Sequence, residues 1–142
     1  MIDAGYIVGL TDGEGCFYVV LSQRDKTKYP RAHIHAQTHF YIKLREDDLA
    51  VLKEVKKFLG FGFIYIQKDT RKNHAHCYRF EANSIRDKLK LIDFFTKHPL
   101  ISPKKQHDFE IFSKVTRMII GKEHFTPEGE TKIRQLKLAM HL

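Results

Sequence analysis

Two carboxylates, Asp12 and Glu14, lie in a glycine-rich stretch that joins two apolar segments. An apolar helix is expected over residues 3–12, and an apolar strand from Cys16 to Lys26. Carboxylates in such a turn can hold a hard divalent cation, because Mg²⁺ and Ca²⁺ prefer oxygen ligands. The same Asp-Gly-Glu-Gly sequence is also compatible with an ordinary polar turn at the end of a helix.

Three glycines share one stripe of the expected first helix. Gly5, Gly9 and Gly13 are spaced four residues apart. Glycine inside a helix costs roughly 1 kcal/mol relative to alanine. The simplest explanation is that another helix backbone approaches closely along this stripe.

The charge of the chain favours an anionic partner. Its 25 Lys and Arg against 17 Asp and Glu give a net charge of +8. The first 21 residues contain three acids and no Lys or Arg, so the positive charge lies in the rest of the chain. A basic body around a small acidic centre suggests a polyanion with a cation held at the acids, although a merely soluble basic protein has the same balance.

A second strand gives the clearest periodic signal. From Ala32 to Leu44 the even positions are mainly apolar and the odd positions polar, over thirteen residues. This alternation predicts one buried face and one polar face. About 11 residues at ~3.3 Å each span roughly 36 Å, close to one turn of duplex DNA.

The remaining elements follow in a regular order. We expect a helix over residues 46–59, a strand over 61–68, a basic loop over 69–73, a strand over 74–82, a helix between Ser84 and Pro99, a helix from Ser102 to Gly121 and a last helix from Thr126. The order α-β-β-α-β-β-α, with further helices, predicts a single α+β domain over residues 1–142 with helices on one face of an antiparallel or mixed sheet.

The uncovered sheet face is the candidate DNA-binding surface, because its amide, imidazole, Arg and Lys groups suit base edges and phosphates. With the neighbouring loops, its candidate residues are Ser22, Arg24, Lys26, Lys28, Arg31, His33, His35, Gln37, His39, Lys43, Tyr65, Gln67, Lys68, Arg71, Cys77 and Arg79. The histidines at 33, 35 and 39, and at 74 and 76, allow two other interpretations, a transition-metal site or a solvated face.

Several classes of protein are poorly supported. No apolar run approaches the ~18 residues of a membrane span, and we expect no signal peptide. Cys16 and Cys77 form no metal or redox pair in the sequence, which is typical of reduced intracellular thiols. No phosphate loop, nucleotide fingerprint or nucleophilic triad motif is present.

The stretch from Ile7 to Gly15 resembles the nine-residue motif of the LAGLIDADG homing endonucleases. Gly9, Leu10, Asp12 and Gly15 match it, and Glu14 replaces the second Asp with another acid. Later segments are also similar to the family: Arg45 after the long strand, the turn over residues 59–62, the break at 98–100, the segment 104–109 and the segment 124–129. The resemblance covers nearly the whole chain and implies the family fold, an antiparallel sheet that sits as a saddle on DNA with helices on the opposite face.

One copy of the motif is present, and in this family single-motif chains act as homodimers whose motif helices pack together. The resemblance thus implies a dimer interface formed by Gly5, Val8, Gly9, Asp12 and Gly13. It also implies that Glu14 and the Gly13 carbonyl help to ligate Mg²⁺, a site that Mn²⁺ or Ca²⁺ can also occupy. Asp12 remains equally explicable as a structural acid at the helix end.

The family places polar and basic residues around this metal site. By position these are Tyr41, Arg45 and Lys105, with Lys104 as the alternative to Lys105. Tyr41 falls where the family often has Gln, so Lys43 or Gln37 can share the orientation of water.

The expected function is site-specific, metal-dependent double-strand cleavage of a long pseudo-palindromic target, as in intron homing. The alternative is a non-cleaving RNA maturase or a DNA-binding regulator of the same fold. The absence of a transit peptide fits an intracellular protein of a prokaryotic cytoplasm or an organelle that encodes it. The target sequence and the nature of the host element are not specified by the chain.

Overall fold

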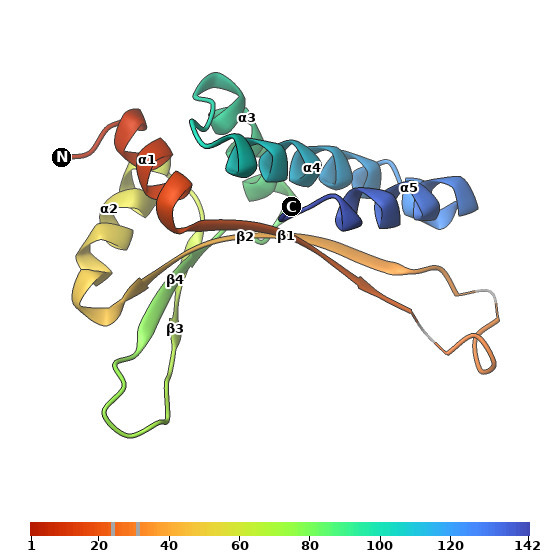
Figure 1. Ribbon diagram of the computed structural model, residues 1–142, viewed down its shortest axis with the longest axis horizontal. Helices are drawn as coiled ribbons and strands as arrows, with labels where there is room; N and C mark the ends of the chain where they lie inside the picture. Colours follow the sequence, from red (N-terminus) through yellow and green to blue (C-terminus); the bar gives the residue numbers. More distant parts are fainter. Residues whose placement is uncertain (24, 31) are drawn as a thin grey trace.

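A computed structural model describes residues 1–23, 25–30 and 32–142 of the chain (Figure 1). The elements are α1 (Ala4–Glu14), β1 (Gly15–Ser22), β2 (His35–Arg45), η1 (Glu46–Asp48), α2 (Leu49–Leu59), β3 (Phe63–Gln67), β4 (Cys77–Glu81), α3 (Ile85–Lys97), α4 (Pro103–Ile120), η2 (Glu123–Phe125) and α5 (Pro127–Leu138). The strands form one antiparallel sheet in the order β1-β2-β4-β3. The α+β class and the expected element order are confirmed.

The sheet is curved, and the helices lie on its convex side (Figure 1). The β3–β4 hairpin and the β1–β2 loop extend down on either side of an open concave face. This arrangement is the expected saddle, with one face covered by helices and one left free.

Strand β2 pairs with both β1 and β4, and its alternation separates the two faces of the sheet. Ile34, Ala36, Thr38, Phe40 and Ile42 are all at most 6% exposed, as the periodicity predicts. The strand itself begins at His35, so it contains 11 residues rather than the expected thirteen. Its length of about 36 Å at ~3.3 Å per residue still matches one turn of DNA.

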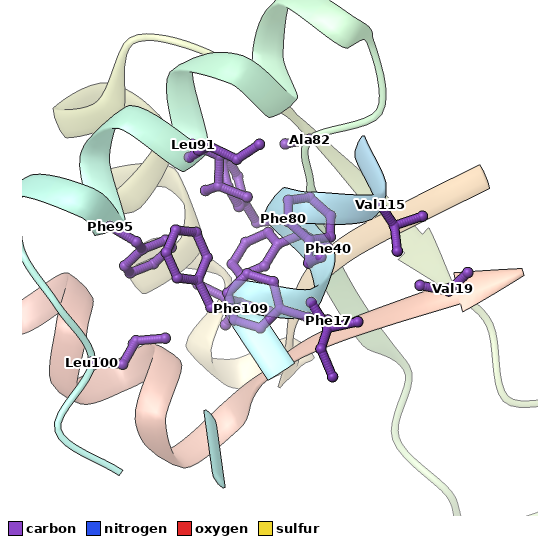
Figure 2. Close-up of a cluster of buried hydrophobic side chains, with 14 of the residues drawn as sticks. Phe17, Val19, Phe40, Phe80, Ala82, Leu91, Phe95, Leu100, Phe109 and Val115 are labelled. Atoms are coloured by element: carbon purple, nitrogen blue, oxygen red, sulfur yellow. The ribbon is translucent and has the colours of Figure 1, made fainter. Parts of the chain in front are cut away.

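Aromatic side chains from the sheet and the helices form the core (Figure 2). The ring of Phe17 lies at its centre, 4.9 Å from Phe40, 5.2 Å from Phe112, 5.6 Å from Phe109 and 5.9 Å from Phe95, measured between centroids. Tilted and edge-on pairs at these separations are favourable beyond the area that they bury. The core therefore fixes β1 and β2 against α3 and α4.

The helix ends follow the expected signals. Ser84, Ser102 and Thr126 each accept a hydrogen bond from the backbone N–H three residues later, at the start of α3, α4 and α5. Gly60 ends α2 with a φ of 78°, a left-handed conformation that favours glycine.

Several boundaries differ from the expected ones. Helix α1 continues through Glu14 instead of ending at residue 12, and β1 ends at Ser22 instead of Lys26. Strand β4 begins at Cys77 rather than His74, because the preceding loop is held by side-chain hydrogen bonds of its own. The acids at 46–48 form the short helix η1 instead of the first turn of α2.

Candidate active site

Glu14 is the last residue of α1, and its side chain is exposed. In the described part of the chain it makes no hydrogen bond or ion pair. The next residue must be glycine, because a Cβ on Gly15 would lie 2.6 Å from Thr11 Cγ2 and 2.8 Å from the Thr11 carbonyl oxygen. The chain can therefore pass directly from helix to strand at Gly15, which leaves the Glu14 carboxylate free at the junction.

Lys105 reaches this junction from the first turn of α4. Its Nζ donates a hydrogen bond to the carbonyl oxygen of Gly15. Lys104 is exposed and has no such contact. Of the two lysines that the sequence offered, the structure brings Lys105 into contact with Gly15, the residue after Glu14.

Asp12 ties the start of α4 to the end of α1. Its two carboxylate oxygens accept hydrogen bonds from the backbone N–H groups of Ile101, at 3.0 Å, and Ser102, at 3.2 Å. This is the structural role that the sequence left open. The carboxylate is directed at its own chain, so it holds Lys105 in place rather than presenting an open surface.

Tyr41 lies on β2, the strand next to this junction. It is paired with Cys16, one residue beyond Gly15. The guanidinium of Arg79 covers its ring at 3.6 Å from the centroid. Burial, and next the hydrogen bond with Cys16, raise the pKa of the Tyr41 hydroxyl. The stacked ring fixes Arg79, a relationship that the sequence pattern did not indicate.

Arg45 is further away. It ends β2 three residues past Ile42, the partner of Gly15, and forms an exposed ion pair with Asp47 at 3.3 Å. The structure therefore groups Glu14, Lys105 and Tyr41 near the junction of α1 and β1. Arg45 makes no contact with Glu14 or Lys105 among the described residues.

The polar face expected of the sheet is formed as predicted. The strand register places nine of the expected residues on one face: Ser22, His35, Gln37, His39, Lys43, Tyr65, Gln67, Cys77 and Arg79. Besides Tyr41 and Arg45, the same register adds five residues that were not singled out as candidates: Cys16, Tyr18, Val20, Phe63 and Glu81. The alternation of β1 could have indicated Tyr18, because its even positions face away from the core.

Hydrogen bonds and stacking order the side chains of this face. The Tyr18 and His39 rings stack at 4.9 Å, and the His39 ring nitrogen lies 3.1 Å from the Gln37 side-chain oxygen. Burial, and then the positive charge of Lys88, lower the pKa of His39, which favours the neutral ring. The face therefore presents neutral hydrogen-bonding groups beside the cation of Arg79.

The basic loops flank this face. Lys26 and Lys28 are exposed in the segment between β1 and β2, and Lys68 is exposed just after β3. His33 lies outside β2 and stacks on Phe125 at 4.6 Å, so it is not a strand residue as expected. Arg24 and Arg31 lie outside the described residues.

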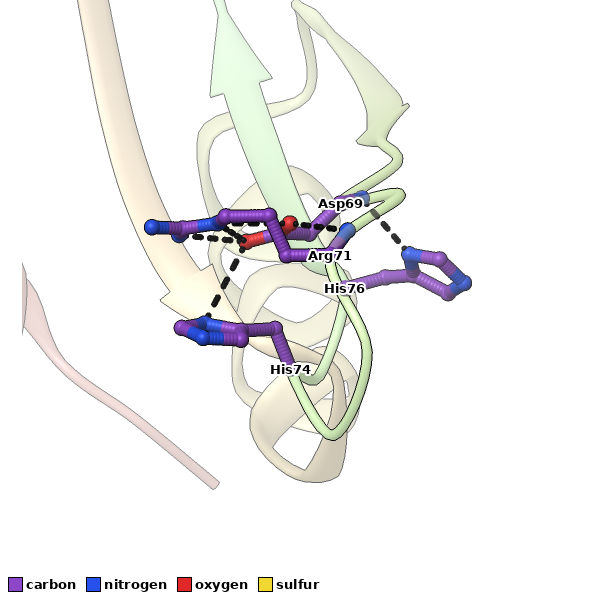
Figure 3. Close-up of polar contacts among 4 residues, drawn as sticks. All are labelled: Asp69, Arg71, His74 and His76. Atoms are coloured by element: carbon purple, nitrogen blue, oxygen red, sulfur yellow. Dashed lines mark hydrogen bonds and ion pairs between the residues drawn. The ribbon is translucent and has the colours of Figure 1, made fainter.

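The β3–β4 loop is organised around one carboxylate (Figure 3). Asp69 accepts hydrogen bonds from the Arg71 side chain, at 2.7 Å from its terminal nitrogen, and lies 3.7 Å from the His74 ring. The Asp69 N–H donates to His76 Nδ1 at 2.8 Å. The Arg71 hydrogen bonds hold the pKa of Asp69 well below its ordinary range. Arg71 is thus paired within its loop. His74 and His76 each interact with Asp69 instead of sharing a metal ligand set.

The exposed side of α1 carries the glycine stripe. Gly5, Gly9 and Gly13 are all exposed, and a Cβ at Gly9 or Gly13 would meet nothing within 4 Å. Val8 is only 8% exposed and belongs to the core of its own chain, so little of its side chain is available to a second helix. The chain itself gives no packing reason for glycine at positions 9 and 13.

The oxygen atoms at the end of α1 fit a hard cation. The last carbonyls of a helix lack helical partners and carry partial negative charge, which favours cations. The free Glu14 carboxylate adds a full charge beside them. Among the described residues no cluster of three His, Cys, Asp or Glu side chains forms a metal site within the single chain. One chain therefore offers one carboxylate and backbone oxygen, which is the chemistry of Mg²⁺ and not of zinc.

A family model described as LAGLIDADG endonuclease matches residues 7–116. The chain belongs to this family. The match begins at the motif that carries Glu14 and includes all four strands and Lys105, so the expected family and fold are confirmed.

Solved LAGLIDADG structures share the fold over the whole chain. The homing endonuclease I-TnaI is 34% identical with a TM-score of 0.79, over 99% of this chain and 89% of that one. The meganuclease I-CpaMI, bound to uncleaved DNA, is 25% identical with a TM-score of 0.84, over 100% of this chain and 45% of its own.

A curated relative has a similar sequence but is much longer. Probable intron-encoded endonuclease 3 of Neurospora crassa is 30% identical over 135 residues, which cover 94% of this chain and 24% of the relative. The chain thus spans about a quarter of that protein's length. None of the described helices is long and apolar enough to cross a membrane.

Proposed function

We propose that this protein is a site-specific homing endonuclease that cuts both strands of duplex DNA. The observation that carries the proposal is the free Glu14 carboxylate at the end of the motif helix, next to Lys105, at one end of a concave polar sheet face. A protein that only binds nucleic acid gains nothing from an unpaired acid near a phosphate, because the two repel each other.

A divalent metal at the catalytic centre would be held by Glu14 and the Gly13 carbonyl. It would supply an activated water and stabilise charge on the scissile phosphate. Lys105 is held by the Gly15 carbonyl through one of its three N–H groups. Its remaining N–H groups and its charge can hold the phosphate near Glu14.

The polar sheet face supplies the DNA-binding surface. Gln37, His39 and Arg79 project from it as hydrogen-bonding groups suited to base edges. The exposed lysines of the flanking loops are suited to phosphates. Because such contacts release counterions, DNA affinity should fall steeply with salt.

The active form is a homodimer in which two α1 helices pack along the glycine stripe. The open space over Gly9 and Gly13 supports close approach of a second helix. Packing two copies there brings two Glu14 side chains together, one for each DNA strand. The length of I-CpaMI, of which this chain covers 45%, is consistent with a pair of such units acting on one DNA.

An intron-encoded, intracellular origin is part of the same proposal, since the curated relative is named as a probable intron-encoded endonuclease.

The direct test joins the two sequences that flank the reading frame into one duplex and incubates it with the protein. We expect cleavage of both strands with Mg²⁺, leaving short 3′ overhangs, and none with EDTA. Binding of this duplex, or of the intron RNA, with no cleavage in Mg²⁺ would instead show a non-cleaving regulator or maturase.

A further inference from the structure

A cavity of about 340 Å³ lies beside the free edge of β2. It exists because β4 pairs with β2 only over residues 41–45, so the first half of β2 faces α3 and α4 instead of another strand. At ~30 Å³ per water molecule the cavity has room for roughly ten waters. Its lining consists of His35, Ala36, Gln37, Thr38, Asn83, Ile85, Lys88, Thr116, Ile119, Ile120 and His124.

Lys88 is the unusual member of this lining. It is 8% exposed, and no hydrogen bond or ion pair holds its amine within the described part of the chain. Lysine side chains are rarely buried to this extent without a partner. Burial lowers the pKa of the Lys88 amine, and no nearby acid offsets the effect.

His124 adds a second unpartnered group to the same cavity. Its Nδ1 is buried and has no hydrogen-bond partner. Burial, followed by His33 and His35, lowers the pKa of its ring. None of the lining residues is acidic, and the carboxylate of Glu81 is engaged by the Asn83 amide at 3.1 Å and by Arg79 at 3.7 Å.

The cavity therefore has cationic and hydrogen-bonding groups without an anion. We propose that it binds a phosphate group, with Lys88 as the charged ligand and Gln37, Asn83 and His124 as hydrogen-bonding partners. His35 and Gln37 also belong to the polar sheet face, so the cavity adjoins the surface proposed for DNA. The phosphate group can come from inorganic phosphate or from a nucleic-acid backbone, and the site does not depend on whether Glu14 cuts DNA.

Titration of the protein with inorganic phosphate tests the site, with chloride at equal ionic strength as the reference. We expect phosphate to raise the thermal unfolding midpoint and to shift the His124 ring signals in NMR spectra of the wild-type protein. Lys88→Met should weaken phosphate binding at least about tenfold, because hydrogen bonds to charged groups are strong. Lys90→Met removes the same charge from an exposed position of α3 and should leave phosphate binding unchanged.

A competition experiment distinguishes the two sources. If phosphate displaces a short non-specific duplex from the wild-type protein but not from Lys88→Met, beyond the effect of chloride, the site takes a DNA backbone phosphate. If phosphate binds without displacing the duplex, the site takes a free anion. If chloride reproduces every effect of phosphate, including the His124 shifts, no phosphate site exists, and this result does not require the Lys88 variant to fold.

Discussion

The Lys105 amine donates a hydrogen bond to the carbonyl oxygen of Gly15, the residue directly after Glu14. Two segments about 90 residues apart in the chain thus meet at one point. Asp12 fixes the meeting through the backbone of Ile101 and Ser102. An acid that the motif includes is therefore used to place a lysine rather than to bind metal.

Replacement of Lys105 tests this arrangement. We expect Lys105→Met to slow single-turnover cleavage about 100-fold, as loss of one well-placed group that stabilises transition-state charge does, while DNA affinity changes much less. Lys104→Met removes the same charge from the preceding residue and should slow cleavage far less. Equal losses in the two variants would show that only the general charge of this helix end matters.

The stack of Arg79 on Tyr41 predicts different outcomes for two substitutions of Tyr41. Tyr41→Phe keeps the ring under the guanidinium and should change DNA affinity by less than about threefold. Tyr41→Ala should weaken binding about tenfold, because a desolvated cation–π contact contributes about 1–2 kcal/mol. Tyr65→Ala removes another exposed ring of the same face that is not stacked on Arg79, and should weaken binding less than Tyr41→Ala. A large rate loss in Tyr41→Phe would instead assign the hydroxyl a role in cleavage.

The glycine stripe can be tested at Gly9, where a side chain has open space within the chain. Gly9→Leu should raise the unfolding free energy of the monomer by about 0.5–1 kcal/mol through helix propensity. It should also shift sedimentation toward the monomer and reduce cleavage, because the added side chain blocks helix approach. Ala50→Leu places the same side chain on the exposed face of α2 and should leave assembly unchanged. If Gly9→Leu dimerised with the same affinity as the wild-type protein, α1 would not form the dimer interface.

The partly buried His124 ring predicts a pH dependence of stability. Its pKa is lowered in the folded state, so the unfolded chain, with an ordinary value of about 6.5, takes up the proton first as pH falls. The contribution of His124 is complete above about pH 6.5 and is lost as the pH falls below it. In phosphate-free buffer, the stability of the wild-type protein relative to His124→Gln should therefore decrease from pH 7.5 to 5.5. A constant difference would mean that the ring titrates normally.

Local patterns in the sequence predicted the strands, the helix caps and the two faces of the sheet. The alternation of β2 placed Gln37, His39 and Lys43 correctly, because a period of two fixes which side chains share a face. The predicted starts of β2 and β4 were wrong by a few residues. Tertiary contacts of His33 with Phe125 and of His76 with Asp69 compete with strand pairing there.

Contacts between distant segments could not be predicted in this way. Nothing near Lys105 in the sequence indicates that it meets Gly15, and nothing near Tyr41 indicates that Arg79 covers its ring. The second contact and the cavity at Lys88 depend on the pairing of β4 with the end of β2. The first depends on how α4 packs against the start of β1. The resemblance to the family identified the region of the site, but the structure chose between Lys104 and Lys105.

The proposal that Glu14 is the metal-binding acid of a DNA endonuclease is tested most directly by Glu14→Gln. The substitution keeps the size of the side chain and removes the charge that the metal needs. Substitutions of groups that hydrogen-bond to metal ligands typically cost about 10–100-fold in activity, so loss of the carboxylate itself should slow Mg²⁺-dependent cleavage by more than about 100-fold. DNA affinity measured in Ca²⁺ or EDTA should stay within about threefold of the wild-type value. Wild-type cleavage by Glu14→Gln would contradict the account, because the metal would then be held by other residues.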